Sequence, residues 1–153
     1  MSLQSFHQRK TKIDSLINKA KSIDNIEINN DFARYITVRI SGLIEVTVRE
    51  CYDEYTSGKA APDVHRYVTR KLKRFQNPRV KDVIELARDF NEGWAAELEW
   101  IDMEVRDAVD SIVTIRHSVA HGGEQGVTLA KVEQYYKQVL KFLELIQRQC
   151  EIM

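Results

Sequence analysis

Apolar residues recur along most of the chain at spacings of three and four positions, the period of an amphipathic helix. The pattern predicts helices over residues 6–23, over about 31–55 with Gly58 closing the segment, from Pro62 to Phe75, from Asn77 and Pro78 to Phe90, over about 98–120 before Gly122, and from Thr128 onward. No strand pattern competes with these helices. The sequence therefore predicts an all-α fold, a helical bundle of about five or six helices with short connections.

We expect residues 1–153 to form a single domain, because there is no internal repeat, low-complexity tract or long linker. A chain of 153 residues with 43% apolar positions can bury a core without metal or disulfides. Cys51 and Cys150 are expected to be free thiols in a reducing, cytoplasmic environment. No apolar run approaches the ~20 residues of a membrane helix, so no membrane partner is expected.

Charge is balanced overall, with 23 basic and 23 acidic residues, so any binding driven by charge must be local. Residues 66–81 contain only cations among their charged positions, and residues 92–110 are mainly acidic. The basic stretch is a candidate site for an RNA backbone, through Arg66, Arg70, Lys71, Lys73, Arg74 and Arg79. The alternative is a solvated helix face, and the two stretches could also pair within or between chains. Trp94 and Trp100 are expected to be core or interface anchors.

The densest chemical cluster is Arg116, His117 and His121, in the last two turns of a predicted helix that glycine terminates. His117 and His121 are four residues apart and share one face, whereas Arg116 and His121 are separated by about 140° around an ideal helix. Arg116 and His121 would converge if the last turn unwound at the glycines. They would also converge if a second copy presented the complementary set across a two-fold axis.

Cleaving RNA without a metal requires a base, an acid and a cation, and histidine and arginine supply these near neutral pH. One alternative is that the three side chains only complement the helix dipole. Another is zinc, since His117 and His121 could both bind one ion. No glutamate follows His117, however, and neither cysteine belongs to a paired spacing. No metal and no cofactor are therefore expected.

The segment from Arg116 to His121 resembles the signature of a HEPN domain, which is an arginine, a polar residue, three further residues and a histidine near the end of a late helix. Residues 33–49, 75–78 and 127–128 are similar to the branch called RiboL-PSP-HEPN. The polar residue is often asparagine in this superfamily, and here it is His117. Which histidine takes the proton and which gives it therefore stays open.

The resemblance implies a metal-independent endoribonuclease that cleaves RNA by attack of the 2′-hydroxyl, acting as a homodimer with Arg116 and His121 of both subunits in one cleft. It also implies a role in defence or stress. An antitoxin or a neighbouring regulatory protein is a possible partner on the same grounds. The alternative is a catalytically inactive HEPN module that binds RNA or a partner protein.

The same resemblance suggests that Glu45, Arg39 and Arg49 support the motif from behind. The spacing of Glu45 and Arg49 alone favours a simpler interpretation, an exposed four-residue ion pair worth a few tenths of a kcal/mol.

Overall fold

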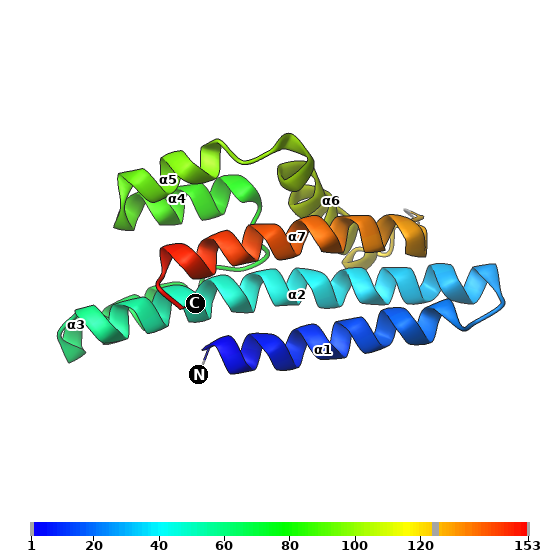
Figure 1. The fold of residues 1–153 in the computed structure, drawn as a ribbon, viewed down its shortest axis with the longest axis horizontal. Helices are drawn as coiled ribbons and strands as arrows, with labels where there is room; N and C mark the ends of the chain where they lie inside the picture. The colour runs from blue at the N-terminus through cyan, green and yellow to red at the C-terminus, as the bar shows by residue number, and fades with distance from the viewer. Residues whose placement is uncertain (1, 124–125, 153) are drawn as a thin grey trace.

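The computed structural model describes residues 2–123 and 126–152, and this part of the chain is entirely helical apart from its connections (Figure 1). The described helices are α1 (Ser2–Lys21), α2 (Ile26–Lys59), α3 (Pro62–Leu72), α4 (Val80–Phe90), α5 (Glu92–Glu99), α6 (Met103–Ala120) and α7 (Leu129–Gln149). The all-α bundle predicted from the periodicity is confirmed, with seven described helices rather than five or six.

The 34-residue helix α2 runs along the long axis of the molecule, with α1 beside it on one side and α7 on the other (Figure 1). Helix α6 packs against both α2 and α7, and α4 and α5 lie side by side. Helix α3 folds back along the C-terminal part of α2, where Asp53 contacts His65 and Thr69, and it packs mainly on that helix. The core where these helices meet includes Ile36, Ile40, Ile44, Val48, Ile112, Val139, Leu143 and Ile146, all fully buried.

Both predicted ends of α2 were wrong. The helix begins at Ile26, because the side chain of Asn25 caps it by accepting a 3.1 Å hydrogen bond from the N–H of Ile28. Gly58 lies inside the helix, which continues to Lys59. Ala61 is extended, with ψ of 152°, because the following Pro62 disfavours a helical conformation at the residue before it.

The predicted start of α4 was also wrong. Asn77 has a φ of +47°, and the helix begins at Val80. Two carboxylates satisfy the free backbone donors at this end: Asp82 accepts from the N–H of Arg79, and Asp110 of α6 accepts from the N–H of Val80, both at 2.9 Å. A contact with a distant helix therefore sets where α4 starts. Helix α3 ends at Leu72, which leaves Phe75 in the connection.

The predicted start of the helix over residues 98–120 was wrong, because the chain turns at residues 100–102 and α6 begins at Met103. Leu98 and Glu99 instead end the separate helix α5, most of which was not predicted. The turn lets the two helices pack on different neighbours, α5 on α4 and α6 on α2 and α7. Trp100 lies at this turn with 87% of its surface exposed, so it is not a core anchor. Trp94 does pack against the core, with its ring 5.0 Å from that of Tyr55.

The two cysteines are free and buried. Burial raises the pKa of both thiols, that of Cys150 to about 12, so they stay protonated and unreactive at neutral pH. Within the described residues, no helix is long and apolar enough to cross a membrane.

Candidate active site

Two glycines determine how α6 ends. Gly122 has a φ of +73° and donates its N–H to the carbonyl of Val119, while the N–H of Gly123 donates to the carbonyl of Ser118 at 2.8 Å. This is a Schellman motif, and it closes the helix without unwinding it. A Cβ at Gly123 would lie 2.3 Å from the hydroxyl oxygen of Ser118, so the turn needs glycine at both positions. His121 is held as the capping residue, with its N–H donating to the carbonyl of His117.

The imidazoles of His117 and His121 lie next to each other on the surface. Their ring centroids are 4.3 Å apart, and the ring planes are inclined at 55°. Both side chains are exposed. Two imidazoles at this separation can contact the same phosphodiester, so one end of α6 presents two side chains of the type that serves as acid and base in catalysis.

Arg116 lies on another side of the same helix. It follows the fully buried Ile112 by four residues and therefore continues the core-facing side of α6, where it is half-buried. No hydrogen bond or ion pair joins its guanidinium to another described residue. Because α6 stays helical through Ala120, unwinding does not bring Arg116 and His121 together within one chain.

The basic stretch divides into two parts. Five of its candidate side chains are exposed on α3 and the turn after it: Arg66, Arg70, Lys71, Lys73 and Arg74. Tyr67 is exposed among them, with the ammonium of Lys71 5.4 Å from its ring centroid, whereas Phe75 packs against the core.

Arg79 is different, because its guanidinium is attached to α6. It donates to the hydroxyl oxygen of Thr114 at 2.9 Å and to the carbonyl oxygen of Asp110 at 3.3 Å. Thr114 precedes His117 by three residues and His121 by seven, so all three share one face of α6. The fold therefore brings a cation from the basic stretch to within about one turn of the histidines.

A comparison with protein families identifies the same similarity over almost the whole chain. The family described as RiboL-PSP-HEPN matches residues 4–151. The chain belongs to this family. No curated protein and no solved structure matches it.

In this RiboL-PSP-HEPN protein, Glu45 and Arg49 do more than form an exposed ion pair. Glu45 accepts from the N–H of Asn77 at 2.6 Å, and Arg49 donates to the carbonyl oxygens of Phe75 and Lys73, each at 2.8 Å. The two side chains lie 3.5 Å apart and hold the connection between α3 and α4, which ends at Arg79.

Arg39 does not contact the connection between α3 and α4. Its guanidinium donates to the phenolic oxygen of Tyr35 at 3.1 Å, away from the connection that Glu45 and Arg49 hold. Thr114 was not among the site residues predicted from the sequence. Its spacing of three and seven residues from the two histidines was the available signal, but only the contact with Arg79 gives that spacing a meaning.

The acidic stretch, residues 92–110, does not neutralise the exposed cations of α3. No ion pair among the described residues joins α3 to residues 92–110; instead, Glu92 and Glu99 pair with Arg88.

Beside the histidine face of α6 there is a hollow of about 380 Å³, lined by Asp107, Asp110, Ser111, Thr114, Ile115 and Tyr135.

The described residues offer the zinc alternative no further ligands within one chain. Among the described residues, no group of three or more His, Cys, Asp or Glu side chains could hold a metal ion. His117 and His121 are therefore a pair of neighbouring imidazoles with no third protein ligand among those residues.

Proposed function

We propose that this HEPN protein is a metal-independent endoribonuclease. The observation that carries the proposal is the exposed pair His117 and His121, 4.3 Å between ring centroids, with Arg116 on the same two turns of α6 and without a partner among the described residues. HEPN domains are often ribonucleases, and this cluster contains the groups that metal-free cleavage of RNA requires.

In the reaction, one imidazole takes the proton of a 2′-hydroxyl, and the resulting oxygen attacks the adjacent phosphorus. The bond to the 5′-oxygen of the next nucleotide breaks, and that oxygen receives a proton from a second imidazole. The products are a 2′,3′-cyclic phosphate and a 5′-hydroxyl. A guanidinium binds two phosphate oxygens in parallel and stabilises the crowded, negatively charged transition state.

The same proposal includes a homodimer. Arg116 and His121 lie on different sides of α6, so Arg116 of one chain and the histidines of another would complete a site across a two-fold axis. A stable interface of this kind buries more than ~1,000 Å² in total. The exposed cations of α3 would then hold flanking RNA, which makes binding strongly dependent on salt. The enzyme would act in the cytoplasm in defence or stress, restrained by an antitoxin or a neighbouring regulatory protein.

The test is cleavage of a labelled RNA in excess chelator. Arg116→Ala and His121→Ala should each reduce the rate at least ~100-fold, since each removes a group that acts in the transition state. His7→Ala is the matched control, because His7 is an exposed histidine on α1, and it should cleave like the unaltered protein. Undiminished cleavage by both site variants would refute the assigned residues.

A second candidate is a catalytically inactive HEPN module that binds RNA or a partner protein. It is favoured by the placement of Arg116 on the core-facing side of α6, because a single chain does not bring it together with His121. RNA binding without cleavage, by a protein that sediments as a monomer, would support this candidate over the nuclease.

A further inference from the structure

A groove of about 300 Å³ lies between α1 and α2, away from the histidines of α6. Its rim has three cations, Arg9, Lys12 and Arg39, and no acidic residue lines it. Its floor is apolar and includes Val38 and Val46, which lie eight residues apart on one side of α2.

Gly42 lies in this groove, between Val38 and Val46, and no described residue packs closely enough against it to require a glycine. It is exposed in the interior of the 34-residue α2, where glycine destabilises a helix relative to alanine. A Cβ built at Gly42 would meet no atom within 4 Å. The missing side chain therefore leaves the backbone of α2 open to something outside the chain.

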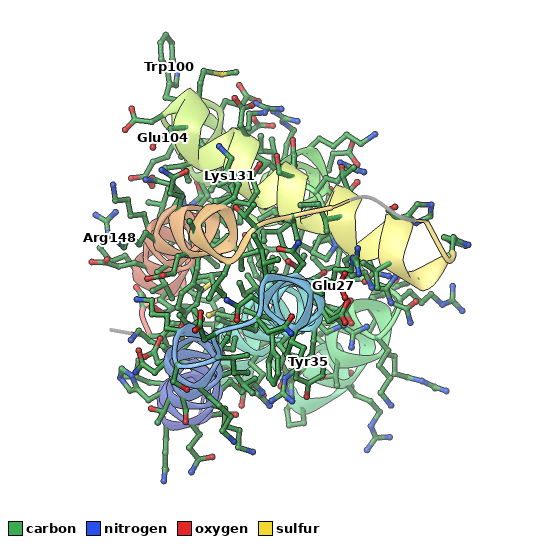
Figure 2. All side chains as sticks on the ribbon, turned by 90° about the vertical axis from the view of Figure 1, so that its right-hand side faces the viewer. Glu27, Tyr35, Trp100, Glu104, Lys131 and Arg148 are labelled. Carbon is green, nitrogen blue, oxygen red and sulfur yellow. The ribbon has the colours of Figure 1, made fainter. Side chains whose placement is uncertain are left out.

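The cations of the rim are only partly neutralised. Arg9 pairs with Glu50 at 3.2 Å, whereas Lys12 makes no hydrogen bond or ion pair with another described residue. Arg39 lies beside Tyr35, with its guanidinium carbon 5.9 Å from the ring centroid. Tyr35 is 47% exposed, and Figure 2 shows it in the lower half of the view, well away from Trp100 at the top.

We propose that this groove binds single-stranded RNA, an inference that rests on the proposed function. A nucleobase would lie on the apolar floor against Gly42, a neighbouring base would stack on Tyr35, and Lys12 and Arg39 would hold phosphates. A second copy of the chain fits less well, because a two-fold contact at Gly42 would place two sets of three cations against each other.

The groove also continues along α2 toward the exposed cations of α3, which the proposed function assigns to RNA. Val46 of the floor is followed on α2 by Arg49, which together with Glu45 holds the connection between the basic helix α3 and α4. The groove and the exposed cations of α3 and the turn after it therefore lie along neighbouring parts of α2. One RNA strand can contact both.

The decisive variant is Gly42→Ala, compared with Gly58→Ala on the same helix. Gly58 is also exposed within α2, and a Cβ there would likewise meet nothing within 4 Å. Both variants should raise the melting temperature, by about 2–4 °C, since alanine favours the helix. Only Gly42→Ala should weaken RNA binding, by at least ~5-fold, because its methyl group occupies the space of a base.

Affinity is measured by fluorescence anisotropy with a labelled, unstructured 20-nucleotide RNA, in a His121→Ala background so that the probe stays intact. Lys12→Glu should weaken binding about tenfold, and Lys19→Glu, an exposed lysine of α1 outside the groove, should weaken it much less. Because both glycine variants are expected to be more stable, misfolding cannot account for a loss confined to Gly42→Ala.

If Gly42→Ala and Lys12→Glu bind the RNA as tightly as their controls, the groove proposal is overturned, even where cleavage still depends on Arg116. Tight binding of a helical peptide of glutamates and leucines to the unaltered groove, with RNA affinity unchanged in both variants, would assign the groove to an acidic protein partner instead. Failure of the unaltered protein to bind or cleave RNA would overturn the proposed function as well.

Discussion

The guanidinium of Arg79, at the start of α4, donates a 2.9 Å hydrogen bond to the hydroxyl oxygen of Thr114, one turn before His117 on α6. Residues 79 and 114 are far apart in the sequence, and their contact joins the basic stretch to the histidine pair. Arg79 is therefore the one member of that stretch, among the described residues, that the structure attaches to the helix of the motif.

Arg79→Ala should reduce RNA cleavage mainly through KM. The variant removes a cation close to the proposed site of cleavage, and we expect a ~5–20-fold rise in KM with a smaller change in kcat. Arg88→Ala is the control, since Arg88 is an exposed arginine of α4 that pairs with Glu99. Equal effects of the two substitutions would mean that Arg79 contributes only to the overall positive charge of the protein, and not to a specific contact with RNA.

The shared site can be tested by mixing two inactive variants. In a dimer that joins an Arg116→Ala chain to a His121→Ala chain, one composite site keeps both functional side chains. Random mixing should therefore restore about one quarter of the activity, because half of the dimers are mixed and each has one intact site of two. Restoration is measured after the chains have been allowed to exchange. If the mixture stays inactive although exchange is demonstrated, Arg116 and His121 do not act across the interface.

The glycines that close α6 should be sensitive to substitution. Gly122→Ala forces a side chain into a φ of +73° and should destabilise the protein by about 1–2 kcal/mol. Gly123→Ala should destabilise it by a similar amount, because the new Cβ would contact Ser118, and Ser118→Ala in the same chain should recover part of the loss.

Denaturant unfolding measures these changes in stability, and Gly126→Ala is the control, since a Cβ there meets nothing within 4 Å. A Gly123→Ala variant as stable as this control would show that the turn after α6 adjusts without cost.

Cys51 and Cys150 should resist alkylation at pH 8 in the folded protein and react rapidly in denaturant, because burial raises both thiol pKa values. The same shifts predict a loss of stability at high pH. Thiols of the unfolded chain ionise above about pH 8.5, whereas the folded thiols stay protonated, so the unfolded state gains stability as the pH rises toward 12. Rapid alkylation of both thiols under native conditions would contradict their burial.

Several features of this protein follow from the sequence alone, because they depend on residues close together in the chain. The three- and four-residue apolar spacing identified the helices, and Thr128 caps α7 as predicted, by accepting from the N–H of Lys131. The position of Arg116 to His121 at a helix end before two glycines was also evident, since a local turn and its sequence are directly linked.

Other features were decided by contacts between distant residues. Helix α4 begins at Val80 rather than at Pro78 because a carboxylate of α6, Asp110, accepts from its backbone N–H. The helix predicted to begin at Leu98 begins at Met103, after a turn that separates α5 from α6, and these two helices pack against different partners. Glu45 and Arg49 bind the backbone of a connection more than twenty residues away, and Arg79, at the end of this connection, donates to Thr114 of α6. Periodicity records which side of each helix is apolar, but the direction from which a distant helix approaches depends on how all the apolar faces are buried together.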